Sequence, residues 1–252
     1  MGLDTEKIKL SVVVVYTNVA QLNEAVSCIE KQTIYPSVET ILLDNREKRF
    51  SSAASALNFG AEKASGEVIV FMHQDVYLWG EDILENYYNF LIDKPDAIAG
   101  LAGVAEADEK NYYDFCETKE KLYRGISTNG KIMPAISLDE CMFAMRKSLW
   151  QKLKFDETAC NNWHFYGADI CFNNLISGGE NYIFSTADAC HESKGNPLNG
   201  SFRKALKAIV KKYKGKLSRI CTTCVNIKCS SFSYFKYCCI AIAVQTKRKI
   251  FK

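Results

Sequence analysis

A histidine and an aspartate, two residues apart, follow a short hydrophobic run, and both side chains can bind a divalent cation. The run is 68–72, VIVFM, and the polar residues after it are His73, Gln74 and Asp75. In an extended chain, residues two apart point to the same face, so His73 and Asp75 can reach one ion. An imidazole and a carboxylate both suit divalent metals. Taken alone, the motif fits a polar turn at a strand end equally well.

The elements that position these side chains alternate between strands and helices. Apolar, β-branched runs predict buried strands at 10–16, 39–43 and 68–72, and helical spacing predicts helices at 21–32 and 53–64. Ser51 or Ser52 can cap the second helix. The alternation indicates an α/β protein with a Rossmann-like, mostly parallel sheet flanked by helices. Ligands bind beyond the carboxyl ends of such strands, where the polar residues lie.

The second half of the chain has a less regular pattern. Helices are predicted at 81–92, 147–153 and 166–176, and strands at 97–104, 138–145 and 181–185. The segment 106–137 is irregular, aromatic and charged, as expected for a substrate-facing insertion. The chain lacks GxGxxG and GxxxxGK[ST], so bound phosphates would need a metal or basic side chains.

Bulk composition is ordinary for a globular protein of 252 residues with a net charge of +3. This charge gives no reason to expect a nucleic-acid partner. No segment has the length and hydropathy of a signal peptide or membrane-spanning helix, so we expect a cytoplasmic location. We also expect the eleven cysteines to be reduced thiols. A zinc site among the C-terminal cysteines is disfavoured by their spacing.

Several motifs occur in the order seen in one enzyme family. They are SVVVVYTN, ILLDN, LNFGAEKASGEVIVFMHQDV, LDECMFAMRKSLW, FDE and WHFYGADICFNNLISGG, with His191 last. Over about 10–193 the chain resembles family 2 glycosyltransferases of the GT-A fold, most of all a bacterial subgroup whose metal motif reads HQD. The resemblance implies a nucleotide-sugar donor, most often a UDP-sugar, and a divalent metal, Mn²⁺ or Mg²⁺.

The resemblance also implies roles for individual residues. It puts the nucleotide against the ends of the strands and the metal on the HQD motif and the last histidine. The nucleotide-binding residues are then Tyr16, Thr17, Asn18, Asp44 and Gln74, and the metal ligands are His73, Asp75 and His191. For Asp44, an Asx turn after the strand is the alternative. For His191, the alternative is a structural histidine.

Two positions depart from the family pattern. His73 replaces the first carboxylate of the family's DxD motif, and an imidazole ligand favours Mn²⁺ over Mg²⁺. At the general-base motif, Tyr166 and Gly167 stand where a Glu-Asp pair is usual, so Asp169 is the only acid left in FYGADI. Asp169 is therefore predicted to be the catalytic base, with Asp139 and Glu140 as alternatives. An aspartate on a helix face paired with a lysine is the other interpretation of Asp169.

The acceptor side is predicted from aromatic and acidic residues. Trp163 and His164 belong to an aromatic run beside Asp169, and apolar sugar faces stack on such rings. Together with Asp139 they are assigned to the sugar acceptor; for Trp163, plain core packing is the alternative. The acceptor is expected to be a glycan or a lipid-linked sugar.

The predicted domains are a GT-A domain over 1–200 and a C-terminal segment over 201–252. Residues 1–105 would bind the nucleotide sugar, and 106–200 the acceptor. The C-terminal segment begins with a basic amphipathic helix near 202–219, which either packs on the domain or lies peripherally on the inner face of a membrane. The oligomeric state is not indicated.

Together these features predict a metal-dependent, inverting glycosyltransferase, of hexosyltransferase type, for cell-surface polysaccharide or glycolipid synthesis. Two alternatives remain at this level. One is a non-catalytic relative that binds a nucleotide or sugar. The other is a sugar nucleotidyltransferase, although TNVAQLNEA after the first strand is neither glycine-rich nor basic.

Overall fold

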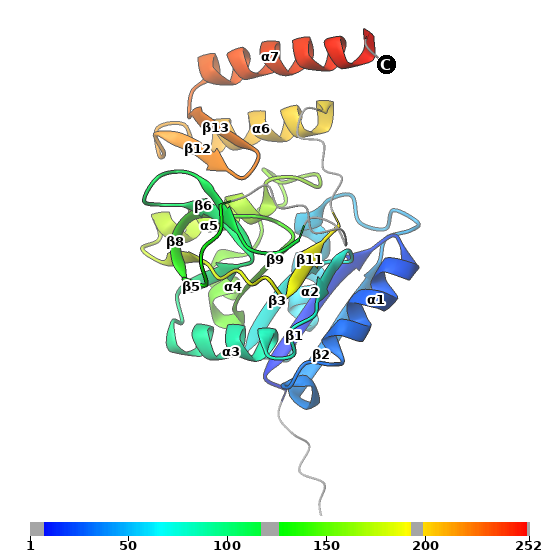
Figure 1. Cartoon of the computed structure of the whole chain (residues 1–252). Coiled ribbons are helices and arrows are strands. Elements are labelled where there is room, and N and C mark those ends of the chain that lie inside the picture. Colours follow the sequence, from blue (N-terminus) through cyan, green and yellow to red (C-terminus); the bar gives the residue numbers. More distant parts are fainter. Residues whose placement is uncertain (1–7, 117–125, 193–198, 251–252) are drawn as a thin grey trace, which may run out of the picture.

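A large mixed sheet with helices on both sides forms the centre of the molecule (Figure 1). The structure, a computed structural model, describes residues 8–116, 126–192 and 199–250. Within these residues the main sheet has nine strands in the order β2-β1-β3-β9-β5-β10-β8-β6-β7. Two further sheets have two strands each, β11-β4 and β12-β13.

The first half of the chain forms the alternating unit that the sequence predicts. Its elements are β1 (Leu10–Tyr16), α1 (Val19–Ile29), β2 (Val38–Asp44), α2 (Ala53–Lys63) and β3 (Val68–His73). The three strands pair in parallel, with β1 in the middle. Asn18 caps α1, and Ser52 caps α2 by accepting a hydrogen bond from the Ser55 amide. The carboxyl ends of all three strands therefore meet at one edge.

The second half extends the sheet with strands of both directions. These elements are α3 (Ile83–Asp93), β5 (Ala97–Gly100), β6 (Ala102–Ala105), β7 (Asn111–Tyr113), β8 (Met133–Leu138), β9 (Met142–Arg146), α4 (Lys147–Leu153), α5 (Tyr166–Ile176) and β10 (Glu180–Ile183). Of the nine strands, β7, β8 and β9 run against the other six. The α/β fold with a mostly parallel sheet is thus confirmed.

Side chains alternate across the sheet into two separate cores. In β1, Val13 points into one core, while Val12 and Val14 point into the other. The first core lies under α2, α4, α5 and α6 (Gly200–Tyr213), and the second under α1 and α3. Because the first five residues of β1 are buried on both faces, its sequence is a continuous hydrophobic run rather than an alternating one.

The C-terminal segment contains more structure than its sequence suggested. After α6 come a hairpin of β12 (Arg219–Thr222) and β13 (Val225–Lys228), then α7 (Ser231–Ile250). The apolar residues of α6, among them Phe202, Leu206 and Ile209, are buried in the first core. The basic helix therefore packs on the domain, and its apolar side is not available to a membrane. The predicted division at residue 200 stays a prediction.

Several predicted boundaries differ from the observed ones. The strand predicted at 97–104 is two strands, because the chain turns at Leu101 between β5 and β6. The strand predicted at 138–145 is also split, with Asp139 and Glu140 in the connection between β8 and β9. Within 106–137, β7 and β8 are ordered strands, and 117–125 lies outside the described residues. In the described part of the chain, no helix is long and apolar enough to cross a membrane.

Candidate functional site

A cavity of about 900 Å³ opens beyond the carboxyl ends of the parallel strands. Its lining combines residues that follow β1, β2 and β3 with residues that precede α5 or begin it. The predicted site residues that line it are Thr17, His73, Gln74, Asp75 and Trp163. The sheet edge that the sequence indicated is therefore a real concave site.

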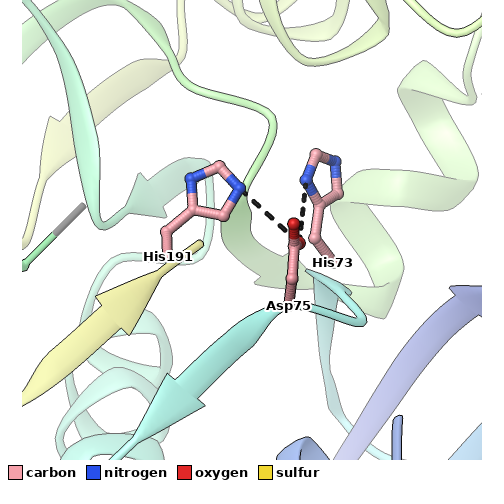
Figure 2. A group of neighbouring side chains, drawn as sticks. All are labelled: His73, Asp75 and His191. Atoms are coloured by element: carbon pink, nitrogen blue, oxygen red, sulfur yellow. Dashed lines mark ion pairs between the residues drawn. The ribbon is translucent and has the colours of Figure 1, made fainter. Parts of the chain in front are cut away.

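His73, Asp75 and His191 form a compact group of potential metal ligands (Figure 2). The Asp75 carboxylate lies between the two rings: its Oδ1 is 3.9 Å from His73 Nδ1 and 3.6 Å from His191 Nε2. One ligand atom from each residue lies within 4.8 Å of the others. Two imidazoles and one carboxylate suit a divalent ion such as Mn²⁺ and leave coordination positions for other ligands. The donor set thus fits the metal that the sequence implied.

A small separate sheet brings His191 to this group. The strand β11 (Ala189–His191) pairs antiparallel with β4 (Val76–Leu78), with His191 opposite Val76. The amide of Glu192 also donates a hydrogen bond of 3.0 Å to the Asp75 carbonyl. His191 is therefore the last residue of a strand, and this strand holds its ring beside Asp75.

The electrostatics of the group keep His73 neutral. Burial, together with the nearby His191, lowers the pKa of His73 below its ordinary value. Burial also raises the pKa of Asp75. His73 Nε2 and the Tyr166 hydroxyl lie 2.7 Å apart in a hydrogen bond, which fixes the imidazole with Nδ1 toward Asp75. A neutral, oriented imidazole is the form that binds a metal.

A second group, Asp139, Cys141 and His191, also has ligand atoms within 4.8 Å. Its carboxylate is already engaged: Asp139 accepts hydrogen bonds of 3.0 Å from the Cys141 amide and 2.7 Å from the Thr223 hydroxyl. Burial raises the pKa of the Cys141 thiol far above its ordinary value, which disfavours the thiolate that a metal needs. The group of His73, Asp75 and His191 is therefore the better candidate for a metal site.

Gln74 holds the loop that follows β1. Its Oε1 accepts hydrogen bonds from the amides of Thr17, at 2.7 Å, and Asn18, at 2.8 Å. Thr17 lines the cavity next to Gln74. Tyr16 and Asn18 flank Thr17 without lining the cavity, and Asn18 Oδ1 caps α1 instead. The middle residue of HQD thus orders the loop after β1 by accepting hydrogen bonds from two backbone amides of that loop.

Basic residues after β2 also face the cavity, and sequence reasoning missed them. Asn45, Arg46 and Lys48 line it, whereas Asp44 does not. Asp44 instead pairs with Arg46 at 2.6 Å, and this guanidinium holds the pKa of Asp44 well below its usual range. The signal for this basic wall was the run 46–49, REKR, directly after a strand end. Its charge suits a diphosphate.

Asp169, the predicted base, lies inside the protein and away from the cavity lining. Its side chain is 1% exposed. Lys212 Nζ lies 2.7 Å from Asp169 Oδ1, and the Tyr213 hydroxyl lies 2.8 Å from the same oxygen. Burial raises the pKa of Asp169, and the Lys212 ammonium opposes this shift. The environment is that of a carboxylate paired with a lysine, the alternative interpretation of its sequence.

The remaining predicted acceptor residues lie apart from one another. Trp163 lines the cavity and is 41% exposed. His164 does not line it, and its ring packs against Phe202 with centroids 5.4 Å apart. Asp139 is engaged by Cys141 and Thr223, as described above. The structure therefore brings only the tryptophan of this set to the cavity.

Glu140 is an acid that does line the cavity. It lies in the connection between β8 and β9, and Gly167 at the start of α5 donates a backbone hydrogen bond of 3.3 Å to Glu140 Oε1. Burial, together with the neighbouring charge of Asp139, raises the pKa of Glu140 to about 8. This carboxyl group combines cavity access with a pKa suited to proton transfer near neutral pH.

Comparisons with known proteins fit this geometry. The Glycosyl transferase family 2 model matches residues 43–154, which is less than half of the chain. The fold is similar to that of GalNAc-T7, solved with UDP, GalNAc and Mn²⁺, with a TM-score of 0.60 and 14% identity over 82% of this chain. The fold is that of GT-A glycosyltransferases. No curated protein matches the sequence.

Two structures of TarS from S. aureus are also similar in fold. One has a TM-score of 0.55 and 14% identity over 83% of this chain, and the other, TarS 1–349 in complex with UDP, has 0.55 and 13% over 83%. This chain spans 48% of GalNAc-T7 and 40% of the first TarS chain, about half or less of their lengths, and 67% of the TarS 1–349 chain. The match to the family and the shared fold together support glycosyl transfer.

Proposed function

We propose that this protein transfers a sugar from a UDP-sugar to an acceptor hydroxyl, with a divalent metal and with inversion at the anomeric carbon. The observation that carries the proposal is the convergence of His73, Asp75 and His191 beside the cavity beyond the parallel strands, which His73 and Asp75 line. The cited structures of GalNAc-T7 and TarS 1–349 contain UDP, which supports a uridine nucleotide donor. The acceptor is a glycan or lipid-linked sugar in polysaccharide or glycolipid synthesis, and the enzyme is a cytoplasmic hexosyltransferase.

The chain's own residues divide the work around the donor. Thr17 and the loop ordered by Gln74 would contact the nucleoside, and Arg46 and Lys48, which line the same cavity, would bind the diphosphate. His73, Asp75 and His191 would hold Mn²⁺ or Mg²⁺, which supplies charge neutralisation for the departing diphosphate. Trp163 offers an exposed ring on which the apolar face of a sugar can stack.

The first test is calorimetric titration of UDP into the protein with Mn²⁺ present and then with EDTA. We expect binding that requires Mn²⁺ and is lost in Asp75→Asn. Asp96→Asn is the matched control, because Asp96 is a 64% exposed aspartate outside the cavity. The anomeric configuration of the sugar product, read by NMR once a donor is found, tests inversion. Absence of binding with UDP, GDP and dTDP alike, with or without Mn²⁺, would sink the proposal.

One observation favours a second candidate, a non-catalytic nucleotide-binding relative. The usual Glu-Asp pair is replaced by Tyr166 and Gly167, and Asp169 is held by Lys212 and Tyr213. Such a protein would bind UDP with Mn²⁺ but release no UDP from any UDP-sugar. Measuring metal-dependent UDP release from UDP-glucose, UDP-galactose, UDP-GlcNAc and UDP-GalNAc, with water as acceptor, separates the two candidates.

A further inference from the structure

Glu140 and the metal group lie on the same cavity, linked by one tyrosine. Glu140, Tyr166, His73 and Asp75 all line it. The Tyr166 hydroxyl is 2.7 Å from His73 Nε2 and 3.4 Å from the Glu140 carbonyl oxygen. The side chain of Asp169 points elsewhere, into the contact between α5 and α6. Among the acids of the described residues, Glu140 and Asp75 are those that line this cavity.

The glycine at 167 and the glutamate at 140 are spatially complementary. A Cβ atom added to Gly167 would lie 3.0 Å from Glu140 Cγ, closer than most such contacts. A side chain at 167 would therefore enter the space that the Glu140 side chain fills. The Gly167 amide, in the first turn of α5, donates a hydrogen bond to Glu140 Oε1, and carboxylates are favoured at helix N-termini. The start of α5 lacks the acids of the usual Glu-Asp pair, and Glu140 from the β8–β9 connection places a carboxylate beside this position.

Building on the function proposed above, we propose that Glu140 is the general base that takes the proton of the acceptor hydroxyl. As the acceptor oxygen forms a bond to the anomeric carbon, its proton moves to a Glu140 carboxylate oxygen. The bond from the anomeric carbon to the diphosphate oxygen breaks, and the UDP leaves with that electron pair. Asp169 becomes a structural residue that joins α5 to α6.

The test compares Glu140→Gln with two other variants by UDP release from the four UDP-sugars named above, with water as acceptor. Glutamine has the same side-chain length as glutamate and keeps an oxygen that can accept the hydrogen bond from the Gly167 amide, but it cannot take a proton. Glu62→Gln is the matched control, because Glu62 is 61% exposed and remote from the cavity lining. Asp169→Asn tests the earlier assignment. UDP titration with Mn²⁺ and thermal unfolding accompany every variant.

We expect Glu140→Gln to bind UDP normally and to lose about a hundredfold or more in the rate of UDP release, as for loss of a general base. The wild-type rate should rise with pH up to about 8, the pKa of Glu140, and this rise should vanish in the variant. Asp139 and Tyr166, which face Glu140, are present in both proteins, so they make the same contribution to the pH dependence of UDP release. The assignment would be overturned if Glu140→Gln released UDP at the wild-type rate and with the wild-type dependence on pH. Absence of UDP binding in the wild type would instead refute the proposed function.

A second inference comes from α7 and is independent of the site. The helix turns Tyr234, Tyr237 and Ala241 toward the rest of the protein, and its opposite side is apolar and exposed. On that side Phe232 is 77% exposed and Phe235 is 65% exposed. Figure 1 shows α7 as the outermost layer, beyond α6. Single exposed apolar residues are common, but clustering on one helix face marks an interaction surface.

The charge around this helix indicates what the surface binds. Residues 193–252 contain fifteen Lys and Arg and no Asp or Glu, so the other 192 residues carry a net charge of −12. The described part includes Lys236 on the exposed side of α7 and several exposed lysines of α6. A second copy docking on α7 would bring two such basic segments together at like-charge cost. We infer that α7 inserts its phenylalanines into an anionic lipid surface, which the basic segment attracts.

The test is co-sedimentation of the full chain with vesicles of phosphatidylcholine alone or mixed with phosphatidylglycerol. The expected result is binding to the anionic vesicles that weakens with salt and falls about tenfold or more in Phe232→Ser/Phe235→Ser. Ile176→Ser is the control, because Ile176 is 49% exposed on α5 and its change leaves the charge unaltered. Equal binding of the double variant and the wild type would overturn the inference. The inference would also be overturned if the wild type did not bind vesicles and the double variant lost self-association, measured by light scattering.

Discussion

The buried ion pair between Asp169 and Lys212 ties α5 to α6, and Asp169→Ala should break it. Lys212 Nζ is 2.7 Å from Asp169 Oδ1 and 2.9 Å from Asp156 Oδ2. The Asp169 side chain is 1% exposed and that of Lys212 is 19% exposed. The Tyr213 hydroxyl, also on α6, lies 2.8 Å from the same carboxylate. Alanine therefore leaves a largely buried ammonium and a buried hydroxyl without their main partner.

Removing one partner of a buried ion pair costs about 3–5 kcal/mol. Asp156 still faces Lys212, so the lower end of this range, about 3 kcal/mol, is expected. For a protein of this size each kcal/mol lowers the melting temperature by about 2–4 °C, which gives a decrease of about 6–12 °C. The double variant Asp169→Leu/Lys212→Met should recover much of the loss, since it removes both charges together.

The assay is thermal and urea unfolding of both variants, with Mn²⁺-dependent UDP binding measured on the folded protein below the transition. We expect Asp169→Ala to unfold earlier while its folded form still binds UDP and releases it from UDP-sugars. A variant that melts like the wild type but has lost UDP release would refute this reasoning. Asp169 would then act in catalysis.

Three further predictions concern the cavity wall. Gly167→Ala should displace Glu140, because the new Cβ would lie 3.0 Å from its Cγ, and enzyme assays should show UDP release falling more than UDP binding. Between pH 4.5 and about 8, Glu140→Gln should become increasingly more stable toward urea than the wild type. The raised pKa of wild-type Glu140 contributes stability that is fully present below pH 4.5 and is lost as pH rises through 8, and glutamine has no such dependence on pH. Equal pH profiles would count against burial of this carboxyl. Gln74→Ala should weaken UDP binding about tenfold by calorimetry, since it frees the Thr17 and Asn18 amides. Unchanged affinity would mean that the loop is ordered without Gln74.

The parallel strands and the site edge could be predicted from sequence because local patterns determine them. The run at 68–72 is buried and β-branched, and the polar residues after it face the cavity as the topology requires. The helix predicted at 166–176 has the observed bounds, Tyr166–Ile176. These elements depend on periodicity and on strand-end placement, which are visible without tertiary contacts.

Side-chain direction at the site could not be predicted in this way. Asp169 was chosen because it was the only acid in its segment, yet its carboxylate turns toward Lys212, which is 43 residues away in the sequence. Glu140 was an alternative only, because nothing in its sequence shows that it packs against Gly167. The exposed face of α7 was likewise not predicted, because the sequence pattern did not distinguish a helix in that segment from irregular chain. Which partner a buried polar group meets is decided by packing between distant elements.

The pairing of β4 with β11 has a consequence for how the protein acquires its site. His191 must close a loop of more than one hundred residues to reach Asp75, and closing such a loop has an entropic cost that local contacts do not repay. During synthesis, the first three parallel strands can associate long before residue 191 leaves the ribosome. The third of the proposed metal ligands therefore arrives only with the β11 strand, and a nascent chain that ends before β11 has His73 and Asp75 without His191. If the proposed site binds a metal, retention of that metal would show that the chain has folded through β11, and not merely that its first half has formed.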